Sequence, residues 1–289
     1  MLKKIILGTV QLGLDYGINN THGKPSLGEA FQILNYAYDN GIRILDTAEA
    51  YGNSQEVIGL FHDEYPEKKF KIITKLNEAN CKLNLSQRIS ENCNTLNVEQ
   101  LDCYMLHNYT VLKKNEELYF KLQEVRKNTF THKIGISLYS NEEIEDVLNN
   151  YEEFDVLQVP FNLFDNEIKR GKLLSKAKEK GFEVHTRSVF LQGLFFKSIE
   201  DLPEKLTQII KYQKMLDEIS KHSDISIVEL AIQYVLQKIY IDKMLIGVDT
   251  IDQLKRNIFL ASKKSKVPHS TIDKINVLEK ELLNPSNWN

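Results

Sequence analysis

Four residues of types that can move a proton lie at separate points along the chain. Asp46 ends the apolar run IRILD, Lys75 ends FKIITK, and His107 ends LDCYMLH. Tyr51 follows Asp46 in the loop that leads into the next helical segment. A phenol has an ordinary pKa of about 10, and a lysine cation within about 4–6 Å stabilises the phenolate and lowers that pKa. Tyr51 is therefore a candidate general acid, with Asp46 keeping Lys75 charged.

This set suits delivery of a proton to a carbonyl oxygen while a second group attacks the carbonyl carbon. His107 beside the phenol would orient the carbonyl or relay the proton. Taken singly, each residue also has an ordinary structural role, since Asp46 could cap the next helix and His107 could be a core histidine. Four such residues, each at or just after the end of an apolar run, favour one shared site. No Cys or His pair lies at metal-ligand spacing, so the sequence predicts no metal site.

Eight short apolar runs supply the strands that would hold these side chains. Their apolarity is continuous rather than alternating, which is typical of parallel strands buried on both faces. The predicted strands cover residues 4–7, 42–46, 70–75, 101–107, 132–137, 154–159, 182–187 and 242–247. Amphipathic helical patterns lie between them. Capping-box pairs mark four helix starts, which are Ser26 with Glu29, Ser140 with Glu143, Ser226 with Glu229, and Thr250 with Gln253.

Strand and helix alternate eight times without a linker rich in Pro, Gly or Ser, which predicts a single domain over residues 1–289. The predicted fold is an α/β (β/α)₈ TIM barrel, in which the C-terminal ends of the strands collect the chemistry on one rim. A doubly wound open sheet is the alternative. It requires a glycine-rich turn after the first strand, and LGTVQLGLDYG has its glycines at the wrong spacing.

Composition excludes several classes of function. The net charge is −3 and the Lys and Arg residues are spread along the chain, which argues against nucleic acid as the main partner. No apolar run approaches the roughly 20 residues of a membrane span, and the three cysteines follow no disulfide or metal pattern. We therefore expect a cytoplasmic protein that acts on a small molecule. The helical segments show no heptad seam, so no coiled-coil assembly is predicted.

The sequence resembles the aldo-keto reductase family over nearly its full length. LDTAEAYGNSQEVIG is similar to that family's D-T-A-x-x-Y-G stretch, ITKL to its lysine strand, and YMLHN to its histidine strand. The resemblance implies that Asp46, Tyr51, Lys75 and His107 form the catalytic tetrad. It implies reduction of an aldehyde or ketone with NADP(H) or NAD(H), bound across the rim without a Rossmann motif. The likeness is strongest to bacterial members linked to surface-sugar synthesis, which implies a sugar-derived carbonyl substrate.

The same resemblance implies a set of cofactor-binding residues. Ser137 and Gln158 would hold the carboxamide of nicotinamide. Arg187 stands where the family usually has an aromatic residue that stacks on the nicotinamide ring, and a planar guanidinium also stacks. SVFLQGLF is similar to the family's S-P-L-x-x-G-x-L loop, and IGVDTIDQLKRN to its I-P-G segment. The residues so implied are Ser188, Phe190, Gly193 and Leu194 at the pyrophosphate, and Gly247, Thr250, Gln253 and Asn257 at the adenosine end.

One departure bears on the choice of cofactor. Many family members carry Arg or Lys where this chain has Val248, Asp249 and Thr250. A 2′-phosphate needs cationic partners, so Asp249 would repel it, while the helix N-terminus at Thr250 would still attract it. We expect a weakened preference for NADPH and use of NADH.

Two other functions stay open. The first is an aldolase that forms a Schiff base on Lys75, although Asp46 would keep that lysine protonated and un-nucleophilic. The second is a catalytically weak regulatory barrel that binds the cofactor. Asn108 and Asn162 are candidates for hydrogen bonds to substrate hydroxyls. The segment NPSNW would either fold Trp288 across the pocket or extend freely.

Overall fold

Eight parallel strands form a closed barrel in chain order in this computed structural model, which describes residues 2–288. The last strand pairs with the first, so the barrel has no open edge. The strands are β1 (Ile5–Gly8), β2 (Ile44–Asp46), β3 (Lys71–Leu76), β4 (Leu101–Leu106), β5 (Thr131–Ser137), β6 (Val156–Pro160), β7 (Glu183–Arg187) and β8 (Lys243–Ile246). Each predicted strand is confirmed, and so is the (β/α)₈ barrel; the open-sheet alternative is wrong.

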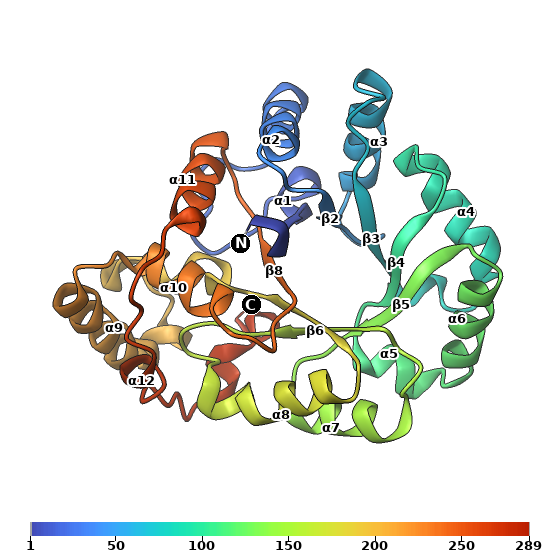
Figure 1. Cartoon of the computed structure of the whole chain (residues 1–289). Helices are drawn as coiled ribbons and strands as arrows, with labels where there is room; N and C mark the ends of the chain where they lie inside the picture. Colours follow the sequence, from blue (N-terminus) through green and yellow to red (C-terminus); the bar gives the residue numbers. More distant parts are fainter. Residues whose placement is uncertain (1, 289) are drawn as a thin grey trace.

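Helices surround the barrel as an outer ring (Figure 1). The α-helices are α1 (Val10–Gly13), α2 (Leu27–Asp39), α3 (Ser54–Glu64), α4 (Leu85–Leu96), α5 (Tyr109–Lys114), α6 (Glu117–Lys127), α7 (Asn141–Asn150), α8 (Glu167–Glu179), α9 (Ile210–Ser223), α10 (Ile227–Leu236), α11 (Ile251–Ser262) and α12 (His269–Ile272). The 3₁₀ helices are η1 (Leu2–Lys4), η2 (Glu78–Asn80), η3 (Leu191–Phe196), η4 (Ile199–Asp201), η5 (Glu204–Ile209), η6 (Lys280–Leu283) and η7 (Pro285–Asn287). None of the helices within residues 2–288 is long and apolar enough to cross a membrane.

Helix starts follow the predicted capping pattern in part. The boxes at Ser26 and Ser140 form completely, with both the hydroxyl and the glutamate half. In the other two boxes only the hydroxyl half forms, because Glu229 and Gln253 bond elsewhere. Gln253, for example, accepts the N–H of Asp249. At these two helix starts the side chain at the third helical position bonds to another group, so it does not bond to the backbone of the capping residue.

The strand period places the candidate site residues above the barrel interior. A small apolar cluster fills that interior, and its members are Ile6, Ile73, Cys103, Met105, Val156 and Leu245, with Ile44 packed against it. Side chains two residues apart on a strand share a face. Lys75 therefore follows Ile73 on the inner face of β3, and Asp46 follows Ile44 on that of β2. The larger apolar core lies between the strands and the helices and fixes this arrangement.

Candidate active site

A cavity of about 1360 Å³ lies at the C-terminal ends of the strands. Most of the residues proposed from the sequence line it, although they come from seven strands or strand-helix loops. Those that do are Asp46, Tyr51, Lys75, His107, Ser137, Gln158, Arg187, Ser188, Phe190, Gly193, Gly247, Gln253 and Asn257. Their convergence follows from the barrel, which carries successive strand ends round one rim.

Leu194 and Thr250 do not line the cavity. Leu194 is fully buried in the core, and its carbonyl accepts a hydrogen bond from the side-chain amide of Gln213 at 2.9 Å. The Thr250 hydroxyl caps α11 by accepting the N–H of Gln253 at 3.3 Å. Both residues therefore support the cavity wall, and their contact with a cofactor stays a prediction.

Asp46 and Lys75 form a buried ion pair at the floor of the cavity. Their side chains are 2% and 1% exposed, and the Lys75 ammonium donates to Asp46 Oδ1. The same ammonium donates to the carbonyl of Thr47 at 3.1 Å, and Gln158 donates its amide to Asp46 Oδ2 at 2.8 Å. Burial lowers the pKa of Lys75, and the Asp46 charge opposes that shift. The two buried charges therefore compensate each other within the pair.

Tyr51 is placed over this pair by a tight backbone turn after β2. Gly52 has a φ of +53°, a region that glycine adopts without strain. A Cβ on Gly13 would lie 1.8 Å from the carbonyl oxygen of Tyr51, so the two loops touch through their backbones. Two glycines are needed here for different reasons, one for its dihedral angle and one for close approach. This accounts for the Y-G of the sequence motif.

The Tyr51 ring meets both Lys75 and His107. The Lys75 ammonium lies 5.3 Å from the centroid of the phenol ring, and the His107 ring meets it edge-on at 5.7 Å between centroids. The four side chains predicted to converge do lie together. Burial lowers the pKa of His107 to about 4, with the Lys75 charge as the second cause. The imidazole is therefore neutral at pH 7.

The sequence-based expectation of a lowered phenol pKa is not met. Burial raises the pKa of Tyr51, the negative charge of Asp46 adds to the rise, and the cation that opposes it is Arg187. Burial of the phenol is the larger cause, and Asp46 beside Lys75 offsets the lysine charge that was expected to lower the pKa. Tyr51 therefore holds its proton firmly at neutral pH, which makes it a proton donor rather than a phenolate.

Ser137, Gln158 and Arg187 lie next to one another on β5, β6 and β7. Ser137 and Gln158 are register partners, and Arg187 Nε donates to Ser137 Oγ at 3.3 Å. The guanidinium carbon of Arg187 lies 4.0 Å from the centroid of the Tyr139 ring. One face of the guanidinium is therefore already covered by an aromatic ring of the protein itself.

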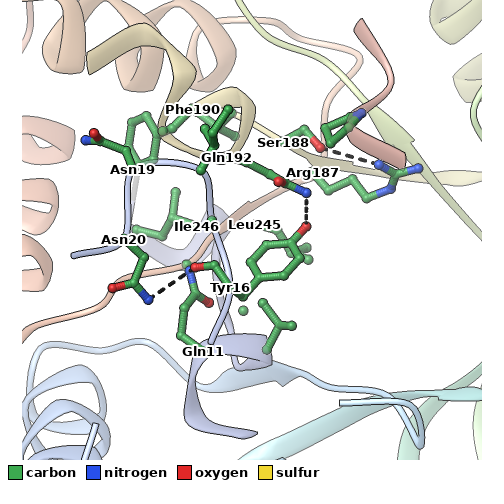
Figure 2. Close-up of a pocket in the computed structure, with 18 of the residues that line it drawn as sticks. Gln11, Tyr16, Asn19, Asn20, Arg187, Ser188, Phe190, Gln192, Leu245 and Ile246 are labelled. Carbon is green, nitrogen blue, oxygen red and sulfur yellow. Dashed lines mark hydrogen bonds between the residues drawn. The ribbon is translucent and has the colours of Figure 1, made fainter. Parts of the chain in front are cut away.

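Two loops meet across the cavity mouth (Figure 2). Tyr16, in the loop after β1, accepts a hydrogen bond of 2.6 Å at its hydroxyl from the side-chain amide of Gln192 in the loop after β7. A Cβ on Gly193 would lie 2.8 Å from Cβ of Asn19, which shows how closely the loops pack. Gln192 has a φ of +54°, a strained value for a side-chain-bearing residue. The contact makes a bridge over part of the cavity.

The far end of the cavity carries charges of both signs. Asp249 after β8 is held by Gln253, whose amide donates to its carboxylate at 3.3 Å. Burial raises the pKa of Asp249. Arg256 on α11 also lines this end and is exposed. Arg256 was missed in the sequence analysis, although it directly precedes the implied Asn257.

A second missed residue is Glu49, in the loop between Asp46 and Tyr51. Its side chain is 1% exposed and its carboxylate collects donors from several elements. Tyr104 of β4 donates to it at 2.9 Å, Asn92 of α4 at 2.8 Å, and Arg88 of α4 pairs with it at 3.0 Å. These contacts anchor the loop that carries Tyr51. The sequence feature that could have identified Glu49 is a glutamate among small residues in that loop.

The two asparagines proposed for substrate hydroxyls bond within the protein, and neither lines the cavity. Asn162 is fully buried and its amide donates to the carbonyl of Ser188 at 3.1 Å. Asn108 caps α5 by accepting the N–H of Val111 at 2.9 Å. Of the two alternatives for the C-terminal segment, the folded one is confirmed, because Trp288 lines the cavity. Its position agrees with the C-terminal end of the ribbon near the middle of the helix ring (Figure 1).

The cavity suits a dinucleotide together with a second small molecule. Its volume exceeds the about 300–1,000 Å³ of ordinary small-molecule sites. Two buried polar atoms at its wall have no partner within residues 2–288, namely Oε1 of Gln11 and Nε1 of Trp288. A Cβ on Gly247 would meet the Gln11 side chain at 2.6 Å, so glycine allows Gln11 to pack against the backbone there. Within the same part of the chain, no three His, Cys, Asp or Glu side chains are grouped to hold a metal ion.

Comparison with known proteins gives the family. A model described as "Aldo/keto reductase family" matches residues 4–277. The aldo-keto reductase YhdN of Bacillus subtilis is 25% identical over 156 residues, which cover 50% of this chain and 47% of that protein, so the chain spans about half the length of this relative. An uncharacterized oxidoreductase of Schizosaccharomyces pombe is 24% identical over 75% of this chain and 69% of its own. The holo form of an aldo-keto reductase from Bacillus halodurans has a similar fold, with a TM-score of 0.77 at 19% identity over 95% of this chain and 92% of its own.

Proposed function

The chain belongs to the aldo/keto reductase family, and we propose that it is an NAD(P)H-dependent oxidoreductase that reduces an aldehyde or ketone to an alcohol. One observation carries the proposal. Tyr51, His107 and the Asp46–Lys75 pair converge at the floor of a cavity that has room for a dinucleotide and a substrate.

Each residue of this group has a definite role in the proposed reaction. Tyr51 donates its proton to the carbonyl oxygen, and its raised pKa keeps that proton in place at neutral pH. His107, neutral because its pKa is about 4, orients the carbonyl through a hydrogen bond. Lys75 stabilises the negative charge that the phenol oxygen gains as the proton leaves. Asp46 keeps Lys75 protonated and in place, and the cofactor supplies the hydride when it is bound.

The proposed cofactor site runs along the rim from β5 to α11. Ser137 and Gln158 would hold the carboxamide, with the amide of Gln158 now engaged by Asp46. The loop that contains Ser188, Phe190 and Gly193 would cover the pyrophosphate. Oε1 of Gln11 offers an acceptor on the opposite wall.

At the adenosine end we propose a weakened preference for NADPH together with use of NADH. Asp249 lies at this end of the cavity and its carboxylate repels a 2′-phosphate, whereas it accepts a hydrogen bond from a ribose hydroxyl. Fluorescence titration of the protein with each cofactor measures the two dissociation constants. A preference for NADPH above about a hundredfold, or about 2.7 kcal/mol, would contradict this proposal.

The substrate class proposed from the resemblance is a sugar-derived aldehyde or ketone. Assay of a panel of such compounds and of simple aldehydes, followed by the loss of NADH or NADPH absorbance, tests the function. Turnover that disappears in Tyr51→Phe supports it, and a panel with no turnover favours the regulatory barrel.

The aldolase alternative is weaker because Lys75 donates to two acceptors in a buried pair. A protonated amine is not a nucleophile. Borohydride treatment in the presence of a carbonyl compound would trap a Schiff base on Lys75 if one formed. Recovery of a labelled Lys75 peptide by mass spectrometry would replace the reductase with the aldolase.

A further inference from the structure

Arg187 is a cation at the reacting end of the cavity without a paired carboxylate. It lines the cavity from the end of β7 and is half-buried. Its side-chain hydrogen bonds within residues 2–288 go to two hydroxyls and a backbone carbonyl and to no carboxylate, although arginine stays charged at any ordinary pH. A desolvated cation without a counter-ion is unfavourable unless the site supplies one.

The contacts of Arg187 are all with neutral groups and all are long. Its guanidinium donates to Ser137 Oγ at 3.3 Å, to Ser188 Oγ at 3.4 Å and to the carbonyl of Leu138 at 3.2 Å. Charge-assisted hydrogen bonds are usually about 2.7–2.9 Å. The Tyr139 ring at 4.0 Å covers one face of the guanidinium. These neighbours hold the side chain in place and leave its charge available.

The other charges at this end of the cavity compensate each other. Asp46 and Lys75 are paired, and His107 is neutral at pH 7. Arg187 is therefore the charged residue near the phenol that has no partner of opposite charge among residues 2–288. Its positive charge opposes the rise in the pKa of Tyr51. A low-dielectric cavity with one excess positive charge attracts an anion.

Of the proposed pyrophosphate loop, the guanidinium donates only to the first residue, Ser188. Two of its three hydrogen bonds reach across the end of β6. They go to Ser137, the last residue of β5, and to Leu138, which follows it. The charge of Arg187 also acts on the phenol of Tyr51, so the guanidinium lies towards the reacting end of the cavity. Trp288 adds a buried indole N–H without an acceptor to the same cavity. The donors in excess here fit oxygen atoms of a substrate.

We propose that Arg187, which the family resemblance implied as a stacking partner of nicotinamide, instead binds an anionic group, a carboxylate or a phosphate, carried by the carbonyl substrate. The reductase then selects charged aldehydes or ketones over neutral ones of the same size. This inference rests on the proposed function and names the class of substrate for it.

Matched substrate pairs test the inference. The first pair is 4-oxobutanoate with 4-oxobutanamide, and the second is glyceraldehyde 3-phosphate with glyceraldehyde, each at constant ionic strength. The anionic member of at least one pair is expected to have a kcat/KM about tenfold higher or more, mainly through KM, as one charge-assisted contact would give. The pair with the larger ratio identifies carboxylate or phosphate. Equal values within both pairs overturn the inference.

Three variants show whether Arg187 causes the preference. Arg187→Met is expected to bring the ratio close to one, and Arg187→Lys to keep part of it. Arg43→Met is the matched control, because Arg43 also lies 4.0 Å from a tyrosine ring, that of Tyr38, but away from the cavity. The inference is wrong if Arg187→Met leaves the ratio unchanged, or if it mainly weakens cofactor binding.

A binding measurement separates this inference from the proposed reaction. Trp288 is the single tryptophan of the chain and lines the cavity, so its fluorescence reports occupancy. The probes are 4-hydroxybutanoate, inorganic phosphate and neutral butane-1,4-diol, added with and without NADH. Anion binding that Arg187→Met abolishes supports the inference even when no carbonyl compound is turned over. Turnover of neutral substrates without anion binding supports the reductase and overturns the anion site.

Discussion

The protein contains two buried aspartate–cation pairs that differ in what surrounds them. Asp46 and Lys75, which are 2% and 1% exposed, lie at the floor of the cavity. Arg170 of α8 and Asp165 just before that helix, 9% and 2% exposed, lie away from the cavity. Arg170 Nε and Nη2 each donate to the Asp165 carboxylate at 2.8 Å, a bidentate contact. Both pairs are equally enclosed, yet only the first faces the site.

The remaining hydrogen bonds show what each pair does. Arg170 also donates hydrogen bonds to the side chain of Asn141 at 2.8 Å and to the carbonyl of Tyr139 at 2.5 Å. These bonds connect the loop after β5 to α8. Lys75 instead lies under the Tyr51 ring. A lysine can give up its proton when its partner is lost, whereas an arginine cannot. Arginine therefore suits the scaffold, and lysine suits a site in which proton affinities matter.

The largest effect is expected from removing the hydroxyl that the cavity pair serves. Tyr51→Phe should lower kcat by about 10³-fold, within the range for loss of a general acid. Cofactor affinity, measured by fluorescence titration, should change less than about twofold, because the ring remains. Tyr119→Phe is the control, since its hydroxyl accepts the N–H of Glu153 far from the cavity. Substantial turnover in Tyr51→Phe would remove this residue from the acid role.

Breaking the scaffold pair should cost stability rather than rate. Asp165→Asn strands a charged arginine in the interior, so the free energy of unfolding should fall by about 3–5 kcal/mol. Urea denaturation measures this, and kcat should change by less than a few-fold. The control is Lys121→Met, which breaks the exposed pair with Glu117 and should change stability by less than about 0.5 kcal/mol. Equal effects of the two substitutions would contradict the scaffold role.

Breaking the cavity pair should do the reverse. Asp46→Asn keeps the shape of the side chain but removes the charge that keeps Lys75 protonated, and burial already lowers the pKa of that lysine. The expected result is a fall in kcat of about a hundredfold, with a smaller loss of stability than Asp165→Asn causes. Steady-state kinetics and urea denaturation on the same samples compare the two. A stability loss as large as that of Asp165→Asn would mean that Lys75 stays charged without its partner.

The smallest expected effect is a pH dependence of stability centred on His107. Burial, and then the Lys75 charge, lower its pKa from about 6.5 to about 4 in the folded protein. Between these values the unfolded chain binds more protons, so the His107 contribution is full above pH 6.5 and is lost as the pH falls towards 4. Between pH 7 and 4.5 the wild type should lose about 2 kcal/mol more stability than His107→Gln. A difference near zero would show that His107 titrates normally.

Much of the site was predictable because, in a barrel, the place of a residue at the end of a strand fixes its place on the rim. Once eight strands alternate with helices, the residues that end neighbouring strands must meet on one rim, which is why Asp46, Lys75 and His107 were found together. Contacts between side chains followed from no such rule. Glu49 bonds to residues of β4 and α4, and nothing in the order of the chain reveals that Tyr104 points at it. Asn162 likewise faces the core although its loop resembles a substrate loop.

The sequence alone determined the strands, the closed parallel barrel and the identity of the four converging residues, because periodicity and end position fix which face and which rim a side chain occupies. Only the tertiary structure decided the electrostatics. The pairing of Lys75 with Asp46 was expected from the sequence, whereas the position of Arg187 against the Tyr139 ring and away from any carboxylate of residues 2–288 depends on neighbours that the chain order does not reveal. The same dependence reverses the expected shift of the phenol pKa, since burial raises the pKa of Tyr51 and the charge of Asp46 adds to the rise.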